Sequence, residues 1–143
     1  MDAEPFREYT TEVRPEWIDY NNHMTDSAYA AVASEATEVF LATLGLSADY
    51  QAATGCTTYT AETHIYFKKE AALGARITVE TVLVDTDPKR IRLRHTLATP
   101  DGPIATVESL YLHVNQHTGR VEPFPADRQH LLNEITTLHK ELS

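Results

Sequence analysis

Polar and ionisable side chains are concentrated in one short segment between Trp17 and Tyr29. In this segment Asp19 stands seven residues ahead of a stretch with helical spacing. A carboxylate placed there can attack an acyl carbon as a nucleophile, or take a proton from water as a general base. The alternative is a turn aspartate that accepts hydrogen bonds from its own backbone.

The start of the helix after Asp19 offers a second chemical group. The first turn of a helix leaves N–H groups unpaired and carries the positive end of the helix dipole. Such a turn can stabilise an oxyanion that forms when a carbonyl is attacked. The elements around this loop must therefore bring a carboxylate and a helix N-terminus together.

Periodicity predicts those elements. Apolar residues recur at three- and four-residue spacing across 27–44, which predicts a helix with Asp26 and Ser27 available as N-caps and Gly45 as the C-cap. A loop is expected from Asp49 to Gly55. Strands are predicted at 8–14, 57–69, 76–85, 90–99 and 104–115, and a second helix at 126–142.

The order of elements is strand, helix, four strands, helix, which indicates the α+β class. The long helix must bury its apolar stripe, and the apolar face of an antiparallel sheet is the available partner. We therefore expect about five strands wrapped around one central helix, with a C-terminal helix added. This is the hotdog fold, although other α+β rolls fit the pattern. The 143 residues predict one domain, with its core at about 8–116.

Composition narrows the function. With 12 Lys and Arg against 21 Asp and Glu, the net charge of −9 argues against binding to nucleic acid or to an anionic membrane. The single cysteine, Cys56, favours a reducing compartment, so we expect a cytoplasmic protein. No signal peptide or membrane-spanning segment is expected.

Basic residues gather between Lys68 and Arg94, against the acidic balance of the rest. A solvated strand face is one interpretation, and a rim that binds anions is the other. The candidates for this rim are Lys68, Lys69, Lys89, Arg90, Arg92 and Arg94.

Metal binding and serine hydrolysis are both disfavoured. His113 and His117 would lie about 13 Å apart on a strand, so no metal site is expected. A GxSxG nucleophile motif is absent from the sequence.

The loop segment resembles the signature of hotdog proteins of the 4-hydroxybenzoyl-CoA thioesterase type. That signature has an aspartate, two residues, Gly-His, a variable residue, Asn-Asn and a later tyrosine. Asp19, His23 and Tyr29 match it, while Asn22 stands at the glycine position and Thr25 with Asp26 replaces Asn-Asn. Asparagine adopts a positive φ less freely than glycine but more freely than most residues.

Within this group the sequence is more similar to the betainyl-CoA thioesterases of carnitine breakdown, including the thioesterase-like domain fused to some L-carnitine dehydrogenases. The similar stretches are 19–27, 58–64, 89–97, 105–108 and 112–114. The resemblance implies a free-standing enzyme that hydrolyses betainyl-CoA to glycine betaine and CoA, with no cofactor because CoA is part of the substrate. The alternatives are a general short-chain or aromatic acyl-CoA thioesterase and a non-catalytic binding module.

The resemblance also implies roles for the loop residues. Asp19 would be the catalytic carboxylate beside the thioester, and the N–H of Asp26 or a neighbour would polarise its carbonyl. His23 would orient the loop, unless it is a structural histidine, and Asn22 would contact substrate. Glu35 and Glu38 are carboxylates on the helix, interpreted as solvent or subunit contacts.

Recognition of a cationic acyl group needs carboxylates and aromatic faces. Glu62 and His64 occupy alternate strand positions, opposite Tyr59, Ala61, Ile65 and Phe67, either as part of a pocket or as an outward charge pair. Glu62, Tyr59 and Trp17 are the predicted substrate-binding residues, with Tyr66 as a further aromatic candidate. Open sheet edges and the family's shared sites predict a homodimer or homotetramer.

Overall fold

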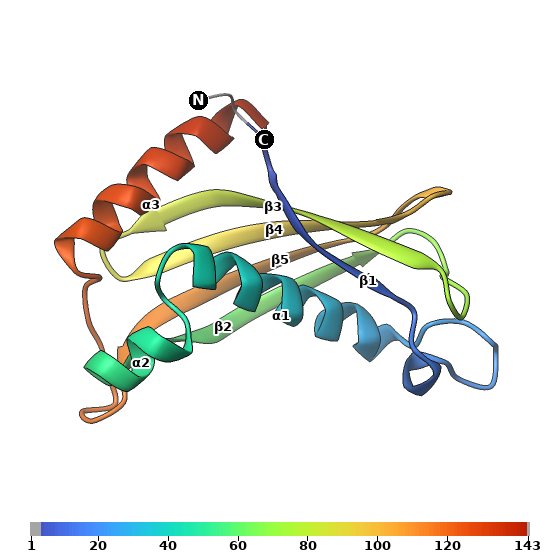
Figure 1. Cartoon of the computed structure of the whole chain (residues 1–143), viewed down its shortest axis with the longest axis horizontal. Coiled ribbons are helices and arrows are strands. Elements are labelled where there is room, and N and C mark those ends of the chain that lie inside the picture. The colour runs from blue at the N-terminus through green and yellow to red at the C-terminus, as the bar shows by residue number, and fades with distance from the viewer. Residues whose placement is uncertain (1–3, 143) are drawn as a thin grey trace.

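The computed structural model describes residues 4–142 (Figure 1). The strands are β1 (Phe6–Glu12), β2 (Cys56–Phe67), β3 (Arg76–Asp87), β4 (Arg90–Thr99), β5 (Gly102–Asn115) and β6 (Arg120–Val121). The helices are α1 (Asp26–Thr43), α2 (Ala48–Thr54) and α3 (Ala126–His139), with 3-10 turns η1 (Pro15–Trp17) and η2 (Lys140–Leu142). None of the helices in the described chain is long and apolar enough to cross a bilayer.

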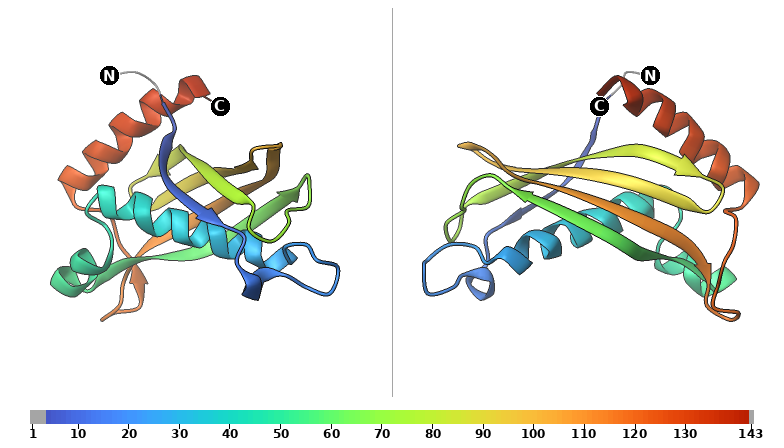
Figure 2. Two further views of the ribbon diagram at one scale, coloured as in Figure 1. Left: turned by 45° about the vertical axis from the view of Figure 1, so that its right-hand side comes forward. Right: turned by 180° about the vertical axis from the view of Figure 1, so that it is seen from behind.

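An antiparallel sheet forms the body of the molecule, with strand order β1-β3-β4-β5-β2 and the short β6 beside β5. The sheet curls around α1, which lies along its concave face (Figures 1 and 2). This arrangement confirms the predicted hotdog architecture of five strands around one long helix. Strands β1 and β2 are the two edges.

Strand β4 shows why the sheet has one buried face. Ile91, Leu93, His95 and Leu97 are all fully buried toward the helix side, and the arginines between them point the other way. This is the alternation that the sequence predicted. We call the side facing α1 the inner face and the opposite side the outer face.

A polar network interrupts the apolar core beneath the middle of α1. The two ring nitrogens of His95 each lie 2.8 Å from a threonine hydroxyl, Nε2 from Thr37 on α1 and Nδ1 from Thr81 on β3. The Thr37 hydroxyl also lies 2.9 Å from the Tyr111 hydroxyl. Burial lowers the pKa of His95 to about 4, so the imidazole is neutral at neutral pH.

The C-terminal helix α3 packs beside β3, where β1 no longer pairs with that strand. β1 reaches only Thr81 of β3. Two residues further on, the Leu83 N–H donates to Nδ1 of His139 at 2.8 Å. The last turn of α3 therefore supplies the acceptor that a neighbouring strand would otherwise provide. Burial lowers the pKa of His139, which keeps this nitrogen free to accept.

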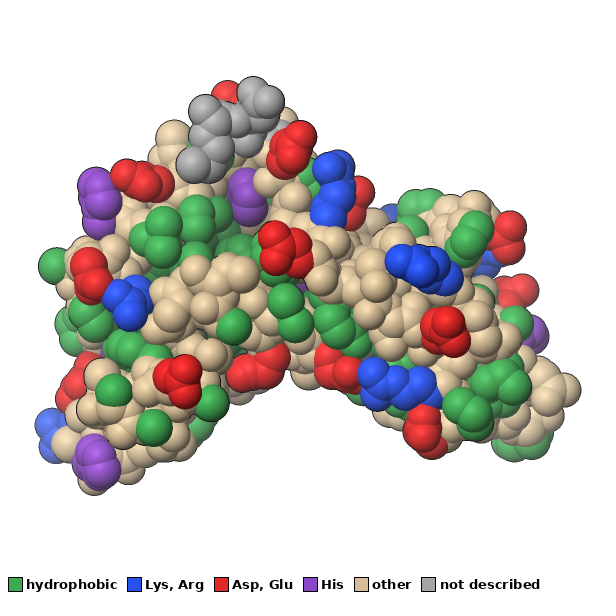
Figure 3. Space-filling view, viewed as in Figure 1, with side chains coloured by type: hydrophobic (Ala, Val, Ile, Leu, Met, Phe, Trp, Pro, Cys, Tyr) green, Lys and Arg blue, Asp and Glu red, His purple; other side chains and the backbone are tan. Residues whose placement is uncertain are grey.

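Apolar side chains also gather at the surface between α3 and α1, as Figure 3 shows. Phe6, Phe40, Ile135 and Leu138 line a shallow pocket there of about 180 Å³. This pocket is the outer margin of the core under α3.

One predicted element is wrong, and several strand and helix ends are shifted by one to three residues. The expected loop at 49–55 is helix α2, because buried Tyr50 anchors it and Gly55 ends it with φ +76°. The first strand runs from Phe6 to Glu12 rather than over 8–14, because the turn η1 begins directly after Arg14.

Candidate active site at the start of helix α1

The chain between η1 and α1 forms a tight turn built on Asp19. One oxygen of its carboxylate, Oδ1, accepts the Asn21 N–H at 2.8 Å, and its carbonyl accepts the Asn22 N–H at 3.0 Å. The Asp19 N–H in turn donates to the His23 carbonyl at 3.2 Å. The turn-capping alternative is therefore confirmed, and the Asp19 side chain also lies half-exposed at the surface.

Asn22 gives this turn its shape. Its φ of 62° lies in the left-handed region, and among residues 4–142 no other non-glycine residue has a positive φ. Asparagine occupies that region more readily than most side chains, since its short amide bonds locally. The backbone at the signature's glycine position thus adopts a conformation typical of glycine.

Backbone hydrogen bonds dock the turn on two neighbouring segments. The Met24 N–H donates to the Ala71 carbonyl at 2.8 Å, and His23 forms a bridge with Ala72. The Thr25 N–H donates to the Trp17 carbonyl at 2.8 Å. The position of the turn therefore depends mainly on backbone contacts.

Helix α1 begins beside this turn with an available donor. Thr25 is the N-cap, and its hydroxyl contacts the Ser27 hydroxyl rather than a backbone N–H. Asp26, predicted as an N-cap, is instead the first helical residue, and its carboxylate accepts the Ser27 N–H at 2.7 Å. Within the described chain no hydrogen bond uses the Asp26 N–H, so that donor is free for a ligand oxygen.

The segment after β2 runs along the first turn of α1. The Tyr29 hydroxyl donates to the Lys69 carbonyl at 3.0 Å, and its ring meets the Phe67 ring edge-on at 5.1 Å between centroids. Burial, and secondly the nearby Glu70 carboxylate, raise the pKa of Tyr29. The residues from Phe67 to Ala72 therefore form one wall of the site.

A pocket of about 410 Å³ opens on the same end of the molecule. It is lined by His23, Lys69, Glu70, Ala71, Ala72, Ala75, Arg76, Thr99, Pro100 and Asp101. His23 connects this pocket to the Asp19 turn. Arg76 is a further cation of this pocket, and it was not among the residues predicted from the sequence.

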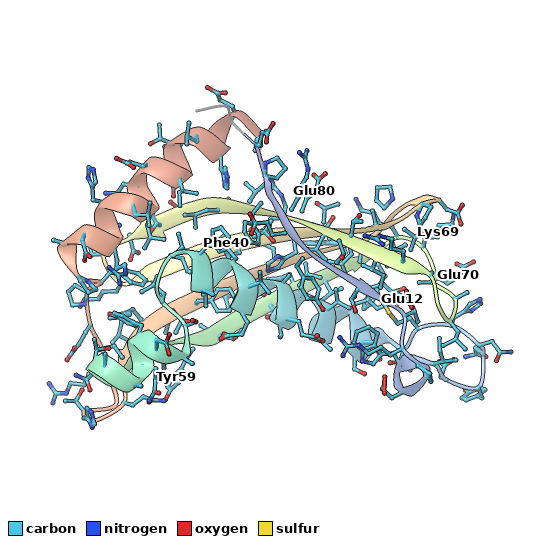
Figure 4. The ribbon with its side chains drawn as sticks, in the orientation of Figure 1. Glu12, Phe40, Tyr59, Lys69, Glu70 and Glu80 are labelled. Carbon is cyan, nitrogen blue, oxygen red and sulfur yellow. The ribbon has the colours of Figure 1, made fainter. Side chains whose placement is uncertain are left out.

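The six predicted anion-binding residues do not form one cluster in a single chain. Lys68 and Lys69 lie at the end of β2, beside the site, as the Lys69 label in Figure 4 shows. Lys89 and Arg90 lie at the β3–β4 turn, at the opposite end of the sheet.

The two remaining arginines of this set, Arg92 and Arg94, lie on the outer face of β4. Acidic residues offset two of the β4 cations: Arg90 pairs with Asp87 at 3.2 Å, and Arg92 lies 3.9 Å from Glu108.

Tyr59 and Glu62 are far from the Asp19 turn in the same chain. The register of β2 shifts between Thr60 and Glu62, so a β-bulge places Tyr59 on the outer face with Glu62 rather than opposite to it. The expectation that Tyr59 faces away from Glu62 is therefore wrong. Tyr59 lies near α2 (Figure 4), eight residues or about 27 Å along the strand from Phe67.

Two other expectations about β2 hold. Glu62 and His64 share one face, with 3.8 Å between Oε1 and Nε2. Ile65 and Phe67 face the other way, since they pair with the buried Val107 and Ala105 of β5.

Trp17 and Glu35 belong to a cluster on the β1 side of the helix. The Arg14 guanidinium lies 4.3 Å from the Trp17 ring centroid and donates to the Glu35 carboxylate at 2.7 Å. The Tyr9 hydroxyl donates to the same Glu35 oxygen at 3.0 Å. These contacts hold β1 and η1 against α1. Glu38 is exposed and lines a separate pocket of about 190 Å³ near the start of β2.

The histidines weighed as metal ligands have other partners. Nε2 of His113 lies 2.8 Å from the Tyr50 hydroxyl, and Nδ1 lies 2.8 Å from the Glu122 carbonyl. His117 is in the turn before β6, where its N–H donates to the Asn115 side chain. Among residues 4–142, no three acidic, histidine or cysteine side chains come together as a metal cluster.

Comparison with known proteins gives the family. A family model described as the thioesterase-like superfamily matches residues 13–132. The chain belongs to this superfamily. The assignment confirms the resemblance read from the loop motif and the class of thioester hydrolase.

Two curated relatives are similar over nearly the whole chain. A betainyl-CoA thioesterase from Pseudomonas aeruginosa is 35% identical over 94% of this chain and 86% of its own length. An L-carnitine dehydrogenase/betainyl-CoA thioesterase from Agrobacterium fabrum is 42% identical over 92% of this chain. This chain spans only 27% of that second, longer protein.

A solved structure of a related protein has the same fold. A Staphylococcus aureus protein in complex with CoA superimposes with a TM-score of 0.91 at 32% identity. The match covers 97% of this chain and 88% of the other.

Proposed function

We propose that this protein is an acyl-CoA thioesterase that hydrolyses betainyl-CoA to glycine betaine and CoA. The observation that carries the proposal is the likeness to the Pseudomonas aeruginosa betainyl-CoA thioesterase over most of both chains. The geometry supports the same chemistry, because a half-exposed carboxylate and a free helix N–H lie on either side of one tight turn.

In the proposed reaction Asp19 either attacks the thioester carbonyl itself or activates the water molecule that attacks it. The N–H of Asp26, at the positive end of α1, stabilises the oxyanion that forms. Collapse of this intermediate expels CoA thiolate, which takes up a proton. If Asp19 attacks directly, an acyl anhydride forms and water then hydrolyses it. If Asp19 is a general base, it takes a proton from the water that attacks the carbonyl, and no anhydride forms.

The remaining loop residues position these groups. His23 holds the turn through its carbonyl and its bridge with Ala72, and its side chain borders the neighbouring pocket. Asn22 sets the backbone direction of the turn. Both roles are those of positioning residues.

Lys68, Lys69 and Arg76 would line the entry for CoA, and its phosphates, which the pantetheine arm separates from the thioester, would lie beyond them. A dimer through β2 would extend this set. Antiparallel pairing of two β2 copies brings the partner's β4 start to the same end of the joined sheet as Lys68 and Lys69. The cations of β4 would then reach the rim from the second subunit.

We propose that two chains pair through β2. This strand is an edge, and both of its faces are exposed from Tyr59 to His64. Two aromatic side chains on its outer face, Tyr59 and Tyr66, are also exposed. An open edge with exposed aromatic residues is a site for association. Light scattering should give at least twice the mass of one chain at micromolar concentration, and a monomer would contradict this proposal.

The proposed activity can be tested by release of free CoA, followed with a thiol-reactive dye over a panel of acyl-CoA thioesters. We expect the largest kcat/KM for betainyl-CoA. Hydrolysis of many short neutral thioesters at the same rate would identify a general thioesterase. Saturable binding without CoA release would identify a binding module.

The buried, unpaired Cys56 suits the reducing conditions of the cytoplasm, where we place this reaction.

A further inference from the structure

The chemistry of a betainyl group restricts where its recognition site can lie, and this inference rests on the proposed function. Only one methylene separates the ammonium nitrogen from the carbonyl carbon, as in the backbone N–Cα–C unit, so the two atoms are about 2.5 Å apart. Aromatic rings attract cations within about 6 Å of the ring centroid. The groups that hold the cation must therefore lie directly beside the Asp19 turn and the start of α1.

The aromatic and acidic residues selected from the sequence do not meet this condition in one chain. Tyr59 and Glu62 lie on the outer face, while the Asp19 turn leads into α1 on the inner side. Trp17 is close in sequence to Asp19, but the Arg14 guanidinium already covers its ring at 4.3 Å. That positive charge opposes a second cation there.

Phe67 is the aromatic residue that a ring contact ties to the first turn of α1. It lies on the inner face opposite buried Ala105, and its ring contacts Tyr29. Tyr29 follows Asp26 by three residues, so both lie on the same side of the first turn of α1. Although it touches the core, the Phe67 side chain is 54% exposed. A large apolar ring thus stays open to a ligand and contacts the same helical turn that carries the free N–H of Asp26.

Glu70 supplies a carboxylate at the same place. It lies on the segment that receives the Asp19 turn, one residue before Ala71, and it borders the pocket shared with His23. Within the described chain no hydrogen bond or ion pair involves its carboxylate. Its charge is therefore not offset by a protein cation in contact with it.

We propose that Phe67 and Glu70 recognise the trimethylammonium of the substrate, with the Phe67 ring against its methyl groups and the Glu70 carboxylate facing its charge. A quaternary ammonium cannot donate a hydrogen bond, so an aromatic face and an electrostatic field are the means of holding it. These residues set specificity and take no part in bond cleavage.

The test compares betainyl-CoA with 3,3-dimethylbutanoyl-CoA, in which carbon replaces the ammonium nitrogen and the shape is kept. The measured quantity is the ratio of the two kcat/KM values in the full-length protein. Phe67→Leu and Glu70→Gln should each lower this ratio about 2- to 30-fold, mainly through betainyl-CoA, which is the range that cation–π and charge contacts give. Phe67→Tyr should retain it.

Matched variants on the other face make the same chemical changes. Tyr66→Leu removes the adjacent ring, and Glu62→Gln removes a carboxylate, both on the outer face. We expect neither to change the ratio. A fall with these two variants, and none with Phe67→Leu and Glu70→Gln, would overturn the proposal.

The experiment separates this inference from the proposed function. If the wild-type protein hydrolyses neither thioester, or both equally, the proposed betainyl-CoA activity fails. If it prefers betainyl-CoA and Phe67→Leu slows both substrates by the same factor, the activity stands and the assignment of Phe67 is wrong. Light scattering on each variant checks that association is unchanged.

Discussion

The two ends of helix α1 differ in whether their backbone groups have hydrogen-bond partners. At the C-terminal end, Gly45 adopts φ +67°, and the carbonyls of Leu41 and Ala42 accept the N–H groups of Leu46 and Gly45. The Arg128 guanidinium adds a hydrogen bond to the Gly45 carbonyl at 3.3 Å. At the N-terminal end the Asp26 N–H stays free in the described chain, beside the half-exposed Asp19.

This difference separates stability from chemistry along one helix. The closed end has hydrogen-bond partners for the carbonyls of Leu41, Ala42 and Gly45 and shares a core cluster with Tyr50 of α2 and Leu132 of α3. Changes there should therefore alter unfolding more than catalysis. The open end leaves a donor and a carboxylate available to a ligand, so changes there should alter catalysis more than unfolding. Four measurements test this division.

Asp19→Asn should have the largest effect. Removal of the carboxylate should lower kcat at least 10²-fold, because catalytic acid–base groups contribute about 10²–10⁴ in rate. The near-isosteric amide should leave the melting temperature almost unchanged. Asp49→Asn, on the exposed surface of α2 at the closed end, is the matched control and should keep full kcat. Retention of most activity by Asp19→Asn would move the reaction to Glu35, Glu38 or Glu62.

Acid should destabilise the helix-covered core through its buried histidines. The folded pKa values of His95 and His139 are lowered, so the unfolded chain binds more protons as pH falls below about 6.5. Their contribution to stability is complete above about pH 6.5 and is lost as the pH falls through the folded pKa values, of which that of His95 is about 4. For His95 the loss is about 3 kcal/mol by pH 4.

Urea unfolding at several pH values between 4 and 7 measures this loss. His95→Gln should be less stable at pH 7 and should show a shallower fall in stability than the wild-type protein. Parallel curves for the two proteins would exclude His95 as the source.

Asn22→Ala tests whether the left-handed backbone orients the Asp19 turn. A non-glycine side chain in this region costs about 1–2 kcal/mol, so alanine should release the turn and lower kcat about tenfold. Asn22→Gly should restore most of the activity, since glycine adopts this φ freely. Equal losses in both variants would instead indicate that the Asn22 amide contacts the substrate.

Gly45→Ala should have the smallest effect on catalysis and a measurable effect on stability. The positive φ and a new Cβ at 2.9 Å from Arg128 Nη2 should lower the free energy of unfolding by about 1–2 kcal/mol. The value of kcat should not change. Gly74→Ala is the matched control, because it has the same strained φ without any neighbour within 4 Å of the added Cβ. A clear loss of kcat in Gly45→Ala would show that the two ends are coupled.

The sequence predicted the fold well because periodicity reports burial directly. The alternation in 90–99 and the helical spacing in 27–44 both correspond to side chains that face one core. The helix at Ala48–Thr54 was missed because only Tyr50 is buried in it, which is too little to produce a pattern. The face on which Tyr59 lies was predicted wrongly because a β-bulge shifts the alternation of side chains along the strand. The residue types around the bulge do not reveal it.

The candidate site was predicted in part. Asp19 and the helix start were found from residue types and spacing, since both belong to one continuous segment. Of the wall from Phe67 to Ala72 only Lys68 and Lys69 were selected, as anion-binding candidates, because the wall joins the site through backbone hydrogen bonds that any side chain permits. Its available signals were the inward alternation of Ile65 and Phe67 and the acidic Glu70 after two lysines.

Because the Leu83 N–H donates to His139, hydrogen exchange at the Leu83 amide reports slow motion of α3. Other amides of β3 exchange with solvent deuterium when a strand separates, but this one is protected by the last turn of a helix. Its exchange should therefore follow the fraying of α3 and be faster than that of Val79, which lies between two strands. Mass or NMR detection of deuterium at Leu83 would then report how often the C-terminal helix lifts from the sheet edge while the rest of the protein stays folded.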